Sequence, residues 1–257
     1  MKLLSVCLTG AFLLSTTLTG HASKIIFNSS EQQDLLGSVY VMNEDGSNKV
    51  LVPGAGDSPS LSPHGTKVVY IAYLAQSNDV CVVNVDGSGF QRLTSTPDND
   101  YNPSWSPDGK KILFSRGEAG VNDIYVMNAD GSSPTKIADV ADDYYPRWSP
   151  DGAKIAFTAS TPNGSAVYTM KPDGSERHAI TGLGVYWAPA WSHDSKKIAF
   201  IGTGANVGDA TDIYIMDADG SDIAQVTSGP AYDLDPCFVT NAKLVYSSER
   251  GASIDIY

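Results

Sequence analysis

The sequence predicts an all-β protein, a β-propeller built of four-stranded antiparallel blades. A segment of about 43 residues recurs along the chain, and each copy holds four short runs of β-branched and aromatic residues. Asp-Gly turns separate the runs, and Asp-Gly is a strong hairpin signal because glycine adopts positive φ without steric cost. No stretch shows sustained helical periodicity. Four antiparallel strands per repeat are typical of a propeller blade.

The first half of the repeat combines an anchoring proline, a tryptophan and a Ser-Pro-Asp-Gly turn. Residues 102–114 return as residues 145–157 and 188–200, and weaker copies surround Pro59 and Pro236. The anchoring prolines are Pro59, Pro103, Pro146, Pro189 and Pro236. We expect the repeated tryptophans, Trp105, Trp148 and Trp191, to fill the space between wedge-shaped blades rather than to stack on a ligand.

The second half of the repeat sets the expected blade number. Residues 123–132 match residues 212–221, with further copies starting at positions 38, 79 and 166. Residues 24–27 align with a second strand, so the first unit is expected to lack its inner strand, and the last unit stops within its third strand. These partial and complete units favour six blades, with five blades as the alternative.

The first 22 residues are typical of an export signal. Lys2 precedes a short apolar segment, and Gly20-His21-Ala22 offers small residues at a cleavage site. The apolar segment is shorter than the ~20 residues that a membrane-spanning helix needs. We therefore expect residues 1–22 to be removed, leaving a propeller of residues 23–257 that is periplasmic or secreted and not inserted in a membrane.

The excess of acidic over basic side chains limits the kinds of molecule that the protein can bind. The chain has 17 basic and 29 acidic side chains, a formal net charge of −12. Such a surface repels nucleic acid and anionic lipid, and it suits cations, basic proteins or solubility alone. We expect a monomer that binds a protein or peptide, with a basic segment as one option.

The repeated motif resembles that of the TolB-like β-propeller family. The resemblance rests on Trp-Ser-Pro-Asp-Gly followed by Asp-Ile-Tyr-(Val/Ile)-Met-Asn-Ala-Asp-Gly-Ser, and it runs over nearly all of residues 23–257. The same repeat occurs in Tol–Pal envelope proteins, in peptidase-associated propellers and in relatives of oligogalacturonate lyases. TolB carries an additional N-terminal α/β domain, which we expect to be lacking here because the first strand follows the signal. The resemblance therefore implies the propeller and leaves a Tol–Pal role open.

Motifs for catalysis are missing from the sequence. It contains no Gly-x-Ser-x-Gly elbow, no His-Glu-x-x-His and no Cys-x-x-Cys, and His64, His178 and His193 are scattered. We expect a non-enzymatic binding module that uses the channel-mouth face of the propeller. The alternative is a metal-assisted carbohydrate lyase or hydrolase of the propeller type.

The loops that lead into the inner strands should surround the mouth of the central channel, on the face opposite the Asp-Gly turns. These loops are rich in acidic and aromatic residues, and Tyr145 and Tyr232 are among the aromatic ones. Either these residues bind a partner, or they are ordinary polar loop residues of an acidic protein. The predicted partner-binding rim consists of Asp57, Asp98, Asp100, Tyr101, Asp142, Asp143, Tyr144, Tyr186, Trp187, Asp233 and Asp235.

Three of these acids share one position in the repeat. Asp100, Asp143 and Asp233 each lie three residues before an anchoring proline, so we expect them to converge on the channel mouth. Gathered carboxylates repel one another unless a cation relieves them. Calcium fits such oxygen ligands better than a transition metal does, and a basic partner segment would serve equally well. No cofactor is required by the sequence; Ca²⁺ is the one candidate.

Overall fold

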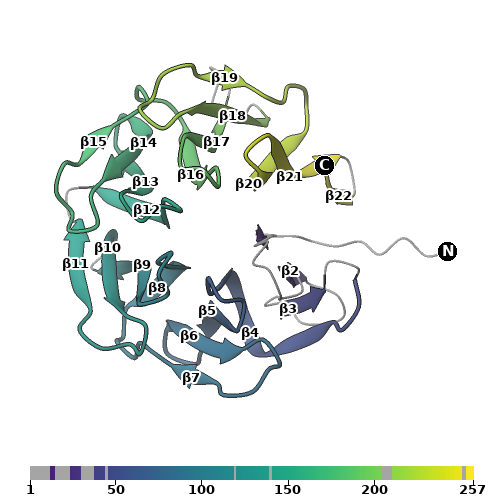
Figure 1. Ribbon diagram of the computed structural model, residues 1–257. Helices are drawn as coiled ribbons and strands as arrows, with labels where there is room; N and C mark the ends of the chain where they lie inside the picture. The colour runs from purple at the N-terminus through teal and green to yellow at the C-terminus, as the bar shows by residue number, and fades with distance from the viewer. Residues whose placement is uncertain are drawn as a thin grey trace.

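The computed structural model describes residues 12–14, 24–29, 38–43, 46–118, 120–138, 141–203, 210–250 and 253–257. All regular secondary structure in these segments is β-strand, and the strands form antiparallel sheets arranged around a common centre (Figure 1). No helix long and apolar enough to span a bilayer occurs in this part of the chain. The predicted all-β propeller of four-stranded antiparallel blades is confirmed. The predicted signal, residues 1–22, lies outside the described residues apart from one short strand.

The strands follow chain order within each sheet. The first sheet has seven strands: β1 (Phe12–Leu14), β2 (Lys24–Ser29), β3 (Ser38–Asn43), β4 (Val50–Leu61), β5 (Lys67–Tyr73), β6 (Asn78–Asn84) and β7 (Gln91–Arg92). The next two sheets are β8 (Asn99–Trp105), β9 (Lys111–Glu118), β10 (Val121–Asn128) and β11 (Thr135–Ala138), then β12 (Asp142–Trp148), β13 (Ile155–Thr161), β14 (Gly164–Met170) and β15 (His178–Ala179). The last two are β16 (Tyr186–Trp191), β17 (Lys197–Thr203), β18 (Thr211–Asp217) and β19 (Ala224–Gln225), then β20 (Tyr232–Thr240), β21 (Lys243–Arg250) and β22 (Ser253–Ile256).

Strand β4 belongs to two blades. Its first part pairs with β3 up to Ala55, and its second part pairs with β5 from Gly56 onward. The described strands therefore form four complete four-stranded blades, β4–β7, β8–β11, β12–β15 and β16–β19. Further strands flank them: β1–β3 with the start of β4 at one end, and the three-stranded sheet β20–β22 at the other. Six blades stay a prediction.

The first unit differs from the sequence-based expectation. Strand β2 pairs with β3 as a second strand should, but β1 pairs with its other edge, Phe12 opposite Ile26 and Leu14 opposite Lys24. In the unprocessed chain the inner position, predicted to be missing, is thus occupied by residues 12–14, which belong to the predicted signal and would leave with it. The backbone groups of β2 would otherwise form an unpaired edge, and an apolar segment of the chain can satisfy them.

The Ser-Pro-Asp-Gly turns connect the first and second strands of a blade. Asp151 Oδ1 accepts hydrogen bonds from Ser149 Oγ at 2.6 Å and from Ala153 N at 3.0 Å. Gly152 follows with a φ of 73°, a conformation that costs a residue with Cβ about 1 kcal/mol or more. The sequence therefore closes this hairpin locally, and the repeat of the motif repeats the hairpin.

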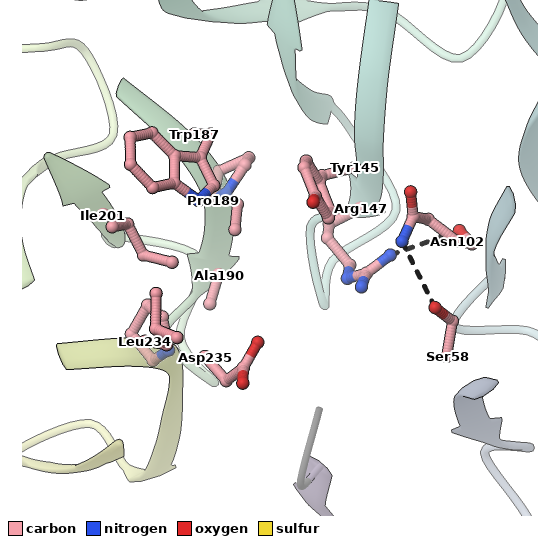
Figure 2. A pocket seen from close by; sticks show the side chains of 12 residues that line it. Ser58, Asn102, Tyr145, Arg147, Trp187, Pro189, Ala190, Ile201, Leu234 and Asp235 are labelled. Carbon is pink, nitrogen blue, oxygen red and sulfur yellow. Dashed lines mark hydrogen bonds between the residues drawn. The ribbon is translucent and has the colours of Figure 1, made fainter. Parts of the chain in front are cut away.

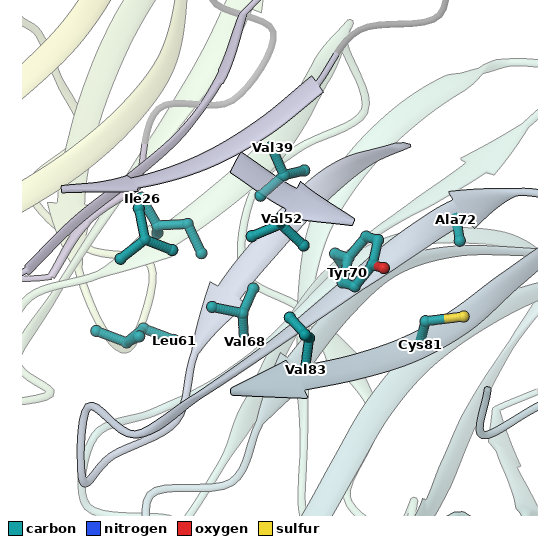
Figure 3. Packing of buried hydrophobic residues seen from close by; sticks show 10 residues of the cluster. Ile26, Val39, Val52, Leu61, Val68, Tyr70, Ala72, Cys81 and Val83 are labelled. Carbon is teal, nitrogen blue, oxygen red and sulfur yellow. The ribbon is translucent and has the colours of Figure 1, made fainter. Parts of the chain in front are cut away.

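The apolar core lies between blades rather than within them. One cluster joins Ile26, Val39 and Val52 to Val68 and Val83 of the next blade (Figure 3). Three further clusters combine neighbouring blades in the same way. Trp105 and Trp191 are buried in these clusters and Trp148 packs against one while half-buried, so the predicted packing role is confirmed.

Candidate functional site

Each described inner strand that contains an anchoring proline carries the same β-bulge there. The pairing register with the second strand shifts across the residue pair that ends in the proline, in β4, β8, β12, β16 and β20. The residue before the proline has a φ between 49° and 53° in all five strands: Ser58, Asn102, Tyr145, Ala188 and Asp235. A left-handed residue other than glycine is uncommon. Its recurrence marks the bulge as a built feature that redirects the strand, as bulges near functional sites do.

These five residues surround a cavity of about 260 Å³ at the centre of the propeller (Figure 2). Arg147, Trp187, Ile201 and Leu234 complete most of its wall, together with residues from the anchoring-proline segments. Trp187, Ile201 and Leu234 lie on one side of the cavity with Asp235 next to Leu234, and the polar groups of Arg147, Asn102 and Ser58 lie on the other side with Tyr145 (Figure 2). The cavity is therefore amphipathic, with contributions from five inner strands.

Arg147 is the basic residue of the cavity wall. Its Nη1 donates to the carbonyl oxygens of Pro146 at 3.0 Å and Asn102 at 3.3 Å, and Asn102 Nδ2 donates to Ser58 Oγ at 3.3 Å (Figure 2). Burial lowers the pKa of Arg147 to about 10, while Tyr145 and Asp235 oppose that shift. The guanidinium thus carries its charge at neutral pH, directed by backbone carbonyls toward the Asn102 side.

Two further hollows adjoin this cavity. A cleft of about 370 Å³ shares Tyr145 and Trp187 with it and adds Tyr144. Toward the Ser-Pro-Asp-Gly turns, a second cavity of about 290 Å³ shares Arg147 and is lined by the repeated apolar residues Leu61, Trp105, Trp148, Trp191 and Phe238. Tyr145 and Trp187 thus connect the cleft to the central cavity. Arg147 lies between the central cavity and the apolar cavity.

The predicted rim residues divide between several environments. Trp187 and Asp235 line the central cavity, and Tyr144 lines the cleft. Asp57 and Asp142 accept hydrogen bonds from the hydroxyls of Tyr73 and Tyr144. Asp142 also accepts bonds from Asn122, and Tyr186 packs edge-on against Phe200 within its own blade. Tyr101 lies at the register position of Tyr144, whereas Asp98 precedes β8.

The three acids proposed to converge on the channel mouth do not do so. Asp100 and Asp143 are fully buried and form bidentate pairs, with Arg116 at 2.7 and 3.1 Å and with Arg177 at 3.0 and 3.2 Å. Burial raises the pKa of both carboxyls, and the arginines oppose that shift.

The reason is the bulge. It turns the residue before the proline into the channel, while the acid two positions earlier packs between blades. Within the described ranges no three His, Cys, Asp or Glu side chains gather as metal ligands, Asp233 included. The carboxylates of Asp100, Asp143 and Asp233 therefore do not lie together as the predicted calcium site requires.

Arg147, Asn102 and Ser58 line the central cavity but were not predicted as site residues from the sequence. The signal was present, because the three positions are defined by the anchoring prolines: one residue after Pro146, and one before Pro103 and Pro59. Regular alternation would place residues three and one before the proline on the same face. Only knowledge of the bulge separates the buried acid from the channel-lining residue.

A known protein family and several solved structures share this architecture. The family model of the TolB β-propeller domain matches residues 16–208 and 146–257. No curated protein sequence matches the chain. The structure is similar to TolB from Agrobacterium tumefaciens, with a TM-score of 0.69 and 22% identity over 79% of this chain and 76% of that one.

Two other solved structures share the fold. TolB from Acinetobacter baumannii has a TM-score of 0.70 and 22% identity over 84% of this chain, which spans 55% of that protein. An oligogalacturonate lyase from Vibrio parahaemolyticus has a TM-score of 0.60 and 13% identity over 98% of this chain and 90% of that one. These likenesses concern the fold, and the family match covers most of the sequence: the chain belongs to the TolB β-propeller domain family.

Proposed function

We propose that this protein is an exported binding module that holds a protein or peptide segment in its central cavity without catalysing a reaction. One observation carries the proposal: Tyr145 and Trp187 line both the central cavity and the adjoining cleft. Aromatic side chains are enriched where protein partners are anchored, because they bury a large area at little entropic cost. An extended segment entering along them would reach Arg147 and Asp235.

The size of the cavity suits part of a peptide rather than a folded domain. A space of about 260 Å³ accommodates one or two side chains, and the cleft of about 370 Å³ extends it. Backbone amides of the segment could donate to Asp235 and its carbonyls could accept from Arg147. We also propose that the module acts in the periplasm or outside the cell; the predicted signal and the membership in the TolB propeller family support this location.

The test is partner capture with matched variants. A photoreactive amino acid at position 187 should cross-link a discrete partner from a cell-envelope extract, and Tyr145→Ala should abolish that product. Phe90→Ala, which removes an exposed aromatic side chain outside these cavities, should leave it unchanged. A product that persists in Tyr145→Ala would contradict the proposal, as would the absence of any product.

The same preparation separates binding from catalysis. Stoichiometric transition metal in the purified protein, together with polysaccharide turnover, would favour the alternative of a metal-assisted lyase. Binding without turnover is the result expected here.

A further inference from the structure

Two junctions between neighbouring blades are closed by a side chain of the inner strand. The residue four positions before the anchoring proline accepts a hydrogen bond from the third strand of the preceding blade. Asn99 Oδ1 accepts from Asn78 N at 2.9 Å, and Asp142 Oδ1 accepts from Asn122 N at 2.8 Å and from its Nδ2 at 2.9 Å. These bonds hold the two blades together where each inner strand begins.

The junction between β14 and β16 is built differently. Four positions before Pro189 the chain carries Val185, whose side chain cannot accept a hydrogen bond. The backbone groups of Ser165 and Gly184 pair instead, with N–O distances of 2.8 and 3.0 Å. The segment before Pro189 is also the one among the five anchoring-proline segments that contains no acidic residue. This junction is therefore neutral, and it is held by backbone contacts.

The cleft of about 370 Å³ lies at this junction. Tyr144, Thr158 and Val167 lie opposite one another in β12, β13 and β14, so they share one face of their blade. Val167 packs in the apolar cluster shared with the β16–β19 blade, which shows that this face is turned toward that blade. Tyr144 and Thr158 thus line the cleft from one blade, and Trp187 lines it from the next.

The lining of the cleft is aromatic and polar but uncharged. Besides Val185 it consists of three aromatic rings and three hydroxyl side chains: Tyr144, Tyr145, Trp187, Thr158, Ser160 and Ser165. None of these lining residues is a carboxylate, an amide or a cation. A charged group of a ligand would lose water here without gaining a counter-ion. The cleft therefore suits a neutral ligand with a large apolar surface.

The hydroxyl groups indicate what the ligand must supply. Thr158 is 2% exposed, and its Oγ1 is buried with no hydrogen-bond partner among the described residues. Ser165 Oγ already accepts from Tyr186 N at 3.0 Å, so its hydroxyl proton is the group it can offer a ligand. The Tyr144 hydroxyl donates to Asp142, so this tyrosine offers the face of its ring. The cleft thus presents hydroxyl donors beside aromatic faces.

We propose that the cleft binds a proline-containing segment of the partner in the polyproline II conformation. This inference rests on the proposed function and names the class of peptide sequence that is bound. Proline has no N–H, so the segment brings no backbone donor to a lining that has no carboxylate or amide acceptor. Its carbonyl oxygens are free, because polyproline II has no internal hydrogen bonds, and they can accept from Thr158 and Ser165. Aromatic-lined grooves bind such preformed segments at a low entropic cost.

NMR titration with acetyl-hexaproline-amide tests the proposal, with the Trp187 indole N–H as the observed signal. Acetyl-(Gly-Ser)₃-amide, a flexible peptide of equal length, should bind at least tenfold more weakly. Tyr144→Ala should weaken hexaproline binding about tenfold or more, because an aromatic packing face is lost. Tyr101→Ala is the matched control and should bind as the wild type does, since Tyr101 lies opposite Ser115 in the preceding blade as Tyr144 lies opposite Thr158.

Thr158→Val separates the loss of a contact from the loss of the fold. Valine keeps the shape of the side chain and removes the hydroxyl, so hexaproline binding should weaken about two- to tenfold, as the loss of one hydrogen bond predicts. The melting temperature of the free protein should stay the same or rise, because a buried hydroxyl without a partner is removed. Ser115→Ala removes the equivalent unpartnered hydroxyl of the preceding blade and should leave the affinity unchanged.

Several results would overturn the proposal: no binding of hexaproline, equal binding of the two peptides, or one affinity shared by wild type, Tyr144→Ala and Thr158→Val. Binding of the neutral disaccharide cellobiose in place of hexaproline would also overturn it and identify a sugar site. A partner cross-linked at position 187 without hexaproline binding would reject the proline segment and leave the peptide-binding function standing. Failure of both experiments would reject both.

Discussion

Arg116 shows how a single residue makes a buried acid tolerable. Its guanidinium forms two hydrogen bonds with Asp100 and lies 5.2 and 5.0 Å from the ring centres of Phe114 and Tyr125. Removing two charges from water costs several kcal/mol for each ion, and the paired geometry offsets that cost. The arginine is therefore expected to matter most as the partner that keeps Asp100 from being isolated.

We predict that Arg116→Met destabilises the protein by about 3–5 kcal/mol, because it leaves a buried carboxylate without its cation. Adding Asp100→Asn to that variant should recover part of the loss. Urea unfolding measures both effects. Lys171→Met is the control, since Lys171 pairs with Glu176 on the surface and such pairs contribute about 0–1 kcal/mol. Equal losses in Arg116→Met and Lys171→Met would contradict the argument.

At the scale of the element, the hairpin turns could be predicted from the sequence and the inner-strand bulges could not. The Asp-Gly turn is determined by local chemistry: Ser149, Asp151 and Gly152 satisfy its hydrogen bonds and its positive φ. The bulge at Tyr145-Pro146 depends on the packing of β12 against its neighbours, and a tyrosine gives no signal for a left-handed conformation. Blade strands and packing tryptophans were therefore correct, whereas Asp100 and Asp143 are buried between blades rather than at the channel mouth.

The turn aspartates make stability depend on pH. Hydrogen bonds from the Ser149 hydroxyl and from backbone amides lower the pKa of Asp151. A carboxyl whose pKa is lower in the folded state stabilises the fold above its unfolded pKa of ~3.9. That stabilisation is lost as the pH falls through the folded pKa. The same direction holds for Asp86, Asp108, Asp130, Asp173, Asp194 and Asp219.

We predict that Ser149→Ala moves the pKa of Asp151 up toward its ordinary value. The variant should therefore lose more unfolding free energy at pH 7 than well below the folded pKa, where Asp151 is protonated in both proteins. NMR titration of the Asp151 carboxyl measures the first effect, and urea unfolding at the two pH values measures the second. An unchanged pKa for Asp151 would contradict this account.

The second Asp-Gly turn of a blade also contacts the blade before it. A Cβ atom added to Gly174, whose φ is 84°, would lie 2.2 Å from the carbonyl oxygen of Ile137. Gly46 has nearly the same φ of 80°, but a Cβ there would meet nothing within 4 Å. Alanine at either position carries a left-handed cost of about 1–2 kcal/mol. We predict that Gly174→Ala loses clearly more unfolding free energy than Gly46→Ala; equal losses would show that the turns do not hold adjacent blades together.

For the whole molecule, the placement of the core between blades determines how the protein unfolds. The cluster around Ile198 and Phe200 combines side chains of the β16–β19 blade with Ala156 and Val167 of the β12–β15 blade. The cluster around Ile155 and Phe157 connects that blade in turn to Leu113 and Ile124 of the blade before it. A blade that unfolded alone would expose the facing halves of two clusters. Such exposure costs about 25 cal/mol for each Å² of apolar surface, so blades should not unfold singly.

We therefore predict one cooperative unfolding transition for the four complete blades. Ile198 is fully buried, and Ile198→Ala should lower the free energy of unfolding by about 2–5 kcal/mol. Hydrogen exchange of the slowest amides should show the same loss in β9 and β10, two blades away, as in β17 and β18, because all of them exchange through the same global opening. A loss of protection confined to β17 and β18 would show that the blades are independent units, and that the shared clusters do not transmit stability around the propeller.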